Sequence, residues 1–161
     1  MQNKALVVID LQNDITKNYK DIIGNVNAAI ERAVANDLHV VYIRHEYLTP
    51  SAKTFLPNTV GSEFVADLNI VSENIFTKNV QNALSSEAFA AFLTENAIAD
   101  LYITGADATA CVKSTCLALR KADYGVTVLS DCITSYNTKK IDEMLRYYEG
   151  KGCKIAALSS L

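Results

Sequence analysis

No long apolar run occurs in this sequence of 161 residues. A membrane span needs roughly 20 consecutive apolar residues, and no stretch comes near that length. The first apolar stretch, residues 5–9, is shorter than the core of a signal peptide and is followed at once by Asp10. We therefore expect neither a membrane anchor nor a secretion signal, and we expect the protein to be cytoplasmic.

The sequence also lacks an excess of either charge. It has 15 Lys and Arg against 18 Asp and Glu, which gives a formal net charge of −3, and the two signs are interspersed. Without a basic cluster, no face is expected to follow the backbone of a nucleic acid or to bind an anionic membrane. The expected partner is therefore a small molecule, and we predict binding to neither nucleic acid nor membrane.

Cysteine is present but shows no pairing pattern. The four cysteines contain no CxxC pair and no metal-ligand spacing; they are Cys111, Cys116, Cys132 and Cys153. On a helix, Cys111 and Cys116 would point about 140° apart, so a disulfide between them is not expected. With 50% hydrophobic residues, a chain of this length can bury one sizeable core without disulfides, so we predict reduced thiols and one domain over residues 1–161.

Short apolar runs alternate along the chain with stretches of helical periodicity. The apolar runs predict strands at residues 5–9, 38–43, 74–78, 100–105, 126–129 and 153–158. The periodic stretches predict helices at residues 21–36, 85–96, 109–122 and 138–150. Such alternation requires right-handed crossovers and helices on both faces of a parallel sheet. The sequence therefore predicts an α/β fold, a three-layer α/β/α sandwich around a mostly parallel, doubly wound sheet.

Residues 44–74 interrupt this alternation. Pro50, Pro57 and Gly61 break the stretch and its periodicity fades, although residues 62–68 could form a short helix. A long excursion within one domain is usually a functional loop or a lid. We expect this segment to contribute to a binding site.

Polar residues stand at the ends of three predicted strands. Ligands of open parallel sheets bind at the carboxyl ends of the strands, and Asp10, Lys78 and the segment leading to Cys111 lie there. Each residue has an ordinary alternative: Asp10 as a cap, Lys78 as a solvated lysine, Cys111 as one more small buried residue. Because the sheet brings its strand ends together, the three could form one site.

Cys111 has the features of a nucleophile. Its predicted position is the start of a helix, where free N–H groups and the helix dipole favour thiolate over thiol. Small neighbours, among them Ala108 and Ala110, leave room for a substrate to approach the backbone. The two histidines begin and end one predicted strand, so no cysteine–histidine pair competes with this interpretation.

Three motifs together resemble those of the isochorismatase-like cysteine hydrolase superfamily. They are DLQND at 10–14, IFTKN around Lys78, and GADATACV at 105–112 followed by KSTCLALRKADYGVTVLSDC. The resemblance extends over nearly the whole chain. It implies one hydrolase domain with a catalytic triad of Asp10, Lys78 and Cys111, assembled as a homo-oligomer, either a dimer or a tetramer.

The resemblance also implies details of the reaction. It gives a cis peptide bond between Ala106 and Asp107, and an oxyanion hole made by the backbone N–H groups of Asp107 and Cys111. Asp10 would take the thiol proton, Lys78 would hold both charges in place, and Cys111 would attack a carbonyl to form a thioester that water hydrolyses. The predicted activity is hydrolysis of a small amide or related C–N bond.

Departures from the family pattern leave the substrate open. Members hydrolyse nicotinamide or N-carbamoyl compounds, whereas isochorismatases proper cleave a vinyl ether and commonly lack the cysteine. Nicotinamidases resemble one another in a metal site of one aspartate and two histidines after the second strand. Here that stretch offers His45 and Glu46 without a second histidine, so we predict no metal and no cofactor. Two further positions depart from the family pattern. Ile15 stands where members commonly have an aromatic residue, and Ala108 stands where they frequently have Thr or Asn.

Substrate specificity is expected from Gln12 and from residues of the long loop. The candidates for substrate binding are Gln12, His45, Tyr47, Phe55 and Phe64. Two other functions remain open: a thiol-based redox or sensor protein, and a non-catalytic binding domain on the same scaffold.

Overall fold

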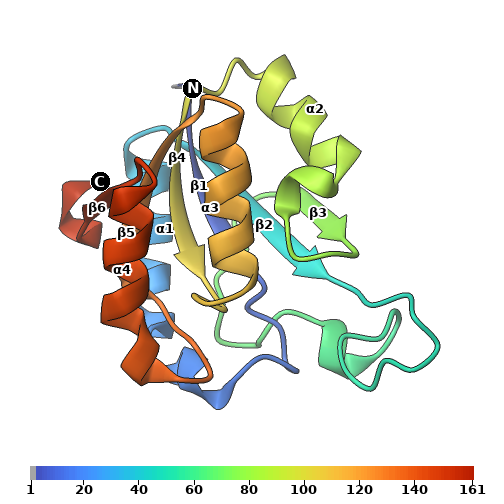
Figure 1. The fold of residues 1–161 in the computed structure, drawn as a ribbon. Coiled ribbons are helices and arrows are strands. Elements are labelled where there is room, and N and C mark those ends of the chain that lie inside the picture. Colours follow the sequence, from blue (N-terminus) through green and yellow to red (C-terminus); the bar gives the residue numbers. More distant parts are fainter. Residues whose placement is uncertain (1–2) are drawn as a thin grey trace.

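The fold is a parallel sheet covered by helices on both faces (Figure 1). A computed structural model describes residues 3–161. Its strands are β1 (Lys4–Ile9), β2 (His39–His45), β3 (Ile75–Lys78), β4 (Asp100–Gly105), β5 (Gly125–Ile133) and β6 (Lys154–Ala156). They form a 6-stranded sheet in the order β3-β2-β1-β4-β5-β6, and every neighbouring pair is parallel. The predicted doubly wound α/β sheet is thus confirmed.

Helices cover the two faces unequally. α1 (Ile23–Ala35) packs on one face, and α2 (Glu87–Glu95), α3 (Cys111–Lys121) and α4 (Ile141–Gly150) pack on the other. Side chains of β1 alternate between the two resulting cores, with Leu6 and Val8 on the α1 side and Val7 and Ile9 on the opposite side. An apolar run buried on both faces is what a central parallel strand requires.

Several predicted elements have other bounds in the structure; for example, the last strand covers only Lys154–Ala156 and the last helix begins at Ile141. The first helix begins at Ile23, because Lys17–Asp21 forms a 3-10 turn capped by Thr16. Residues 62–68 are not a helix: a 3-10 turn ends at Ser62, and Phe64 then pairs with Gln12 in an antiparallel bridge. β5 extends to Ile133, beyond the apolar run, because Ile133 pairs with Gly105 at the end of β4.

The segment between β2 and β3 lies beyond the carboxyl ends of the strands, at the lower right of Figure 1. The residues after β1 hold it there. Asn13 donates its backbone N–H to the carbonyl of Glu63, and Asp14 donates to that of Gly61. The Asp14 carboxylate also accepts from the backbone N–H of Phe55 at 2.8 Å. The loop is therefore tied to the sheet next to Asp10.

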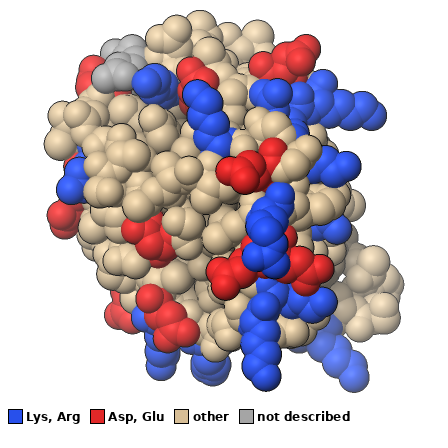
Figure 2. Space-filling model, turned by 60° about the vertical axis from the view of Figure 1, so that its left-hand side comes forward, with Lys and Arg blue, Asp and Glu red and all other residues tan. Residues whose placement is uncertain are grey.

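Charge on the surface is mixed, as the composition indicates. On the face drawn in Figure 2, Lys and Arg side chains lie among Asp and Glu rather than in a field of one sign. Among the helices of residues 3–161, none combines the length and the apolar character that crossing a membrane requires.

Candidate active site

Asp10 is held at the end of β1 in an unusual backbone conformation. Its φ is 56°, in the left-handed region that aspartate tolerates better than branched residues do. Its backbone N–H donates to the carbonyl of Ile43 in β2. The residue is only 1% exposed, so its carboxylate needs a partner within the protein.

The end of β4 brings the next site residue close to Asp10. Gly105 pairs with Ile9 and has a φ of 112°. A Cβ at this position would lie 2.1 Å from the carbonyl oxygen of Ile9, so only glycine permits the approach. The turn that follows contains a cis peptide bond between Ala106 and Asp107, and it leads directly to Cys111, the first residue of α3.

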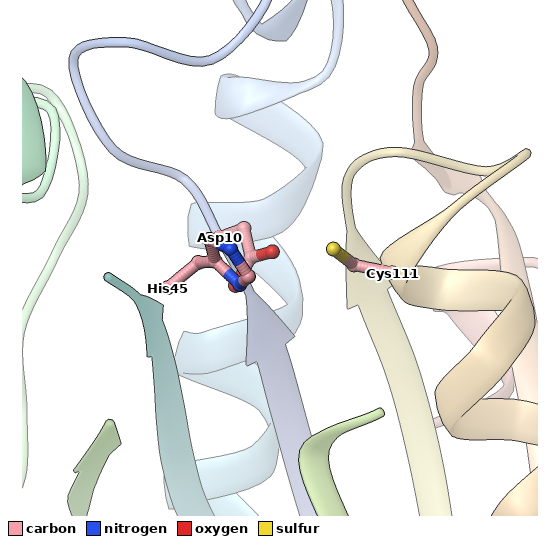
Figure 3. Close-up of side chains that lie close together, drawn as sticks. All are labelled: Asp10, His45 and Cys111. Carbon is pink, nitrogen blue, oxygen red and sulfur yellow. The ribbon is translucent and has the colours of Figure 1, made fainter. Parts of the chain in front are cut away.

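Lys78 joins the site from the end of β3. Its side chain is buried, and its Nζ lies 3.0 Å from Oδ2 of Asp10, 2.7 Å from Nδ1 of His45 and 3.3 Å from Sγ of Cys111. An ammonium has three N–H donors, and these three acceptors use all of them. Figure 3 shows Asp10, His45 and Cys111 converging from the ends of β1 and β2 and the start of α3. The structure therefore brings the three predicted triad residues together, with His45 as a fourth member of the group.

The carboxylate of Asp107 connects two turns around the site. Its Oδ1 accepts hydrogen bonds from the backbone N–H and the hydroxyl of Thr109 and from the hydroxyl of Ser135, each at 2.8 Å. Its Oδ2 accepts from the backbone N–H of Tyr136 at 2.8 Å. The turn before α3 is thus fixed to the segment after β5. Among the described residues, the backbone N–H groups of Asp107 and Cys111 have no hydrogen-bond partner, so both can donate to a ligand.

A small cavity opens beside Cys111. Its volume is ≈ 200 Å³, which suits a ligand smaller than a typical drug. The residues that line it are Asp10, Ile15, His45, Tyr47, Phe55, Gln81, Asp107, Ala110, Cys111 and Tyr136. Its walls are largely aromatic or apolar, and the polar groups of Asp10, His45 and Cys111 lie close together among them.

Burial controls the titration of the site. Burial raises the pKa of Asp10 above its usual value, and the charge of Lys78 opposes this shift. Burial also raises the pKa of Cys111 to about 12; the negative charge of Asp10 adds to the effect, and Lys78 opposes it. The expectation that the helix start leaves Cys111 as a thiolate is therefore wrong for the free protein. Its thiol is protonated at neutral pH and needs a base to become reactive.

Cys111 is expected to be alkylated before the other three cysteines, because it alone among the four is not buried. Its rate with iodoacetamide should still rise between pH 7 and pH 9, since its pKa is about 12. Mass-spectrometric mapping of the adducts over a pH series measures the order in which the cysteines are labelled and the rise in rate at Cys111. Cys153 is the competing thiol, because a hydrogen bond with Cys116 lowers its pKa. Earlier labelling of Cys153 than of Cys111 in the folded protein would contradict this expectation.

Three of the five predicted substrate-binding residues line the cavity. The ring of His45 lies 4.2 Å from that of Tyr47 and 5.7 Å from that of Phe55, centroid to centroid, in edge-to-face contacts. Gln12 and Phe64 do not line it. The side chain of Gln12 forms its hydrogen bonds with the backbone instead. Its amide nitrogen donates to the carbonyls of His45 and Ser62, and its amide oxygen accepts from the backbone N–H of His45.

Phe64 is directed to a different part of the molecule. Its ring packs against Tyr42 and under the guanidinium of Arg44, whose Cζ lies 5.7 Å from the ring centroid. Phe64 is thus part of the packing on the α1 side of the sheet.

Sequence reasoning missed several residues of the cavity. Tyr136 follows the carboxyl end of β5, so extending the strand-end rule to this strand would have found it. Gln81 carries no local signal in the sequence, and Ala110 was identified only as a small neighbour of Cys111. The contact of His45 with Lys78 was also missed, because it joins residues from two different strands.

The residues present do not fit a nicotinamidase-type metal site. The two histidines of the chain, His39 and His45, stand at opposite ends of β2, roughly 20 Å apart at 3.3 Å per residue. Ligand atoms of Asp10, His45 and Cys111 do lie within 4.8 Å of one another. The ammonium of Lys78, however, contacts all three residues and already supplies the positive charge there.

Comparison with known proteins agrees with the resemblance in the motifs. A protein of Arabidopsis thaliana named as a probable inactive nicotinamidase is 28% identical over 156 residues, covering 81% of this chain and 80% of the relative. An isochorismatase-like hydrolase from Alkaliphilus metalliredigens has a TM-score of 0.90 at 22% identity, covering 98% of this chain and 96% of the other. The pyrazinamidase of Pyrococcus horikoshii, solved in complex with zinc, has a TM-score of 0.86 at 24% identity, covering 97% and 99%. The isochorismatase domain family matches residues 4–159, and the chain therefore belongs to this family.

Proposed function

We propose that this chain is a cysteine hydrolase that cleaves a C–N bond of a small, non-peptide amide through a thioester intermediate. Cys111 is the nucleophile, Asp10 the proton acceptor and donor, and Lys78 the cation that holds them together, within one domain of residues 1–161. The observation that carries the proposal is the contact of one buried ammonium with Asp10 Oδ2 and Cys111 Sγ, beside a cavity of small-molecule size.

The reaction follows from this arrangement in two steps. Asp10 takes the proton of the Cys111 thiol as the sulfur attacks the amide carbonyl, and the backbone N–H groups of Asp107 and Cys111 stabilise the oxyanion. As the C–N bond breaks, protonated Asp10 gives its proton to the departing amine. In the second step Asp10 takes a proton from water, which attacks the thioester and releases a carboxylic acid. Cys111 regains its proton, and the site returns to its starting state.

The lining of the cavity favours an uncharged substrate. Asp10 and Asp107 are among the residues that line it, and neither an arginine nor a lysine is. A substrate with its own carboxylate would meet the like charge of Asp10, while the three N–H donors of the nearby Lys78 are already used by Asp10, His45 and Cys111. We therefore propose neutral amides, as in nicotinamidase-type hydrolysis, rather than N-carbamoyl acids.

A panel of small neutral amides assayed for ammonia release tests the proposal. Release should depend on Cys111 and disappear in Cys111→Ala, and rapid quenching should trap an acyl group on Cys111 by mass. A second candidate function is that of a binding domain without activity, because the Arabidopsis thaliana relative is named as a probable inactive nicotinamidase. Binding of an amide without turnover, under conditions where the fold is intact, would favour that candidate.

Activity is expected to survive exhaustive chelation, because Lys78 supplies the positive charge in the site and a second nearby histidine is missing. The measurement is ammonia release before and after dialysis against a strong chelator, with metal content determined on the same samples. Loss of activity that one divalent metal restores would contradict this prediction.

The value of kcat/KM should fall in acid, because Asp10 must be ionised to accept the thiol proton. Its pKa is raised above 3.8, so the loss begins at a higher pH than for an exposed aspartate. By about pH 4, His45 would also become protonated beside Lys78, so little activity should remain there. A profile of kcat/KM from pH 4 to pH 8 measures this fall in activity on the acid side. A constant kcat/KM down to pH 4 would exclude Asp10 as the base.

A further inference from the structure

The contact between Lys78 and His45 determines which nitrogen of the imidazole carries the proton. The two atoms, Lys78 Nζ and His45 Nδ1, lie 2.7 Å apart. A lysine ammonium can only donate, so Nδ1 must accept with its lone pair and the proton must sit on Nε2. Burial, with the charge of Lys78 as a second cause, lowers the pKa of His45 to about 4, so the ring is neutral at pH 7.

The Nε2–H group of His45 has no partner of its own. His45 is 2% exposed, and its Nε2 makes no hydrogen bond among the described residues. A buried donor left unpaired destabilises the folded protein. A ligand that offers an acceptor to this atom would remove that cost.

His45 lies in the same small group as the nucleophile, on the β2 side of it: a ring nitrogen of His45, a carboxylate oxygen of Asp10 and Sγ of Cys111 lie within 4.8 Å of one another. In the sheet, β1 lies between β2 and β4, and Figure 3 shows Asp10 between His45 and Cys111. His45 lines the cavity with the rings of Tyr47 and Phe55 packed at its edges. A substrate whose carbonyl lies at Cys111 can therefore extend toward β2 between flat aromatic walls.

We propose that the Nε2–H of His45 is a substrate-binding donor, which selects small planar amides carrying an uncharged hydrogen-bond acceptor on the β2 side of the scissile carbonyl. The inference rests on the proposed function, since it assigns the substrate class of the same site. In this role His45 has two separate contacts: Nδ1 accepts from Lys78, and Nε2 donates to the substrate.

Two substitutions separate these contacts. Asparagine is short, and its amide oxygen can take the place of Nδ1, so His45→Asn keeps an acceptor for Lys78 and removes the donor at Nε2. Glutamine reaches further, so His45→Gln can keep an N–H near the place of Nε2 and removes the acceptor for Lys78. The probes are nicotinamide and benzamide, which have the same shape and differ by a ring nitrogen in place of a C–H.

The expected readout is the ratio of kcat/KM for nicotinamide to that for benzamide. Wild type should prefer nicotinamide about tenfold, the value of one hydrogen bond. In His45→Asn the ratio should fall to about 1, chiefly through a higher KM for nicotinamide. In His45→Gln the preference should persist while kcat falls for both amides. A wild-type ratio near 1, or an unchanged ratio in His45→Asn, would overturn the inference.

Imidazole nitrogen NMR gives a second test that needs no turnover. The chain has only two histidines, so labelled histidine yields two ring systems, and His45→Asn assigns them. In Cys111→Ala, His45 should show a protonated Nε2 whose N–H signal shifts with nicotinamide and much less with benzamide. If this shift occurs but no amide is hydrolysed, the proposed function fails and the donor role stands. If nicotinamide causes no shift, the donor role fails, whatever the activity.

Discussion

Asp10→Asn is expected to lower kcat at least about 1,000-fold, near the upper range for loss of a general base. Burial is the main reason why the pKa of the Cys111 thiol is raised to about 12, so the thiol needs a base to become a nucleophile at pH 7. Asparagine can still accept a hydrogen bond from Lys78, but it cannot take the thiol proton or return a proton to the leaving amine. Steady-state kcat on the best amide of the panel measures the loss.

A matched carboxylate outside the cavity serves as the control. Asp131 accepts a hydrogen bond from the backbone N–H of Leu158 at 2.9 Å and does not line the cavity. Asp131→Asn should retain kcat within about twofold, apart from any loss of folded protein, which circular dichroism quantifies. If Asp10→Asn kept more than a tenth of the wild-type kcat while folded, another base would have to activate Cys111.

Lys78→Met should lose activity and stability together. Without the ammonium, Asp10 and Cys111 lose the charge that lowers the pKa of both, so the thiol becomes harder to ionise and kcat should fall at least about 100-fold. Removing one partner of a buried ion pair also leaves the other charge unpaired. The free energy of unfolding at pH 7 should therefore drop by about 3 kcal/mol.

The loss of stability should depend on pH. Asp10 has a folded-state pKa raised above its unfolded value, and loss of Lys78 raises it further. Its protonated form is thus favoured by folding, and stability falls as pH rises from about 4 toward the folded-state pKa. Urea unfolding at pH 4 and pH 7 should show a smaller difference between Lys78→Met and wild type at the lower pH.

An exposed ion pair provides the comparison for Lys78. Lys140 lies 3.5 Å from Glu143, and the two side chains are 53% and 63% exposed. Lys140→Met should change the free energy of unfolding by less than about 0.5 kcal/mol at either pH, because solvent screens this pair. If Lys78→Met behaved like Lys140→Met, with unchanged kcat, then Lys78 would have no part in the site.

The strands and their carboxyl ends follow from patterns that are local in the chain, whereas the order of the strands in the sheet comes from the structure. The buried run of β1 contains its own alternation between two cores, and the helix of Cys111 shows its own periodicity, so both could be predicted without any distant contact. The rule that parallel strands present their carboxyl ends together then identified Asp10, Lys78 and Cys111 as candidates. Helix bounds and the end of β5 differ from the predicted ones, because they depend on caps and on pairing between strands.

Distant contacts decided what these residues can do. Lys78 is 68 residues from Asp10 and 33 from both His45 and Cys111 in the chain, so no local pattern indicates that it donates to all three. The raised pKa of Cys111 likewise depends on burial and on Asp10, which outweigh the helix start. Gln12 was expected to contact substrate, yet its side-chain amide forms hydrogen bonds with the backbone of His45 and Ser62. The sequence by itself thus determined the fold and the reactive residue types. Only the tertiary structure decided their protonation, their partners and the walls of the cavity, because electrostatics and packing depend on distances that sequence separation does not contain.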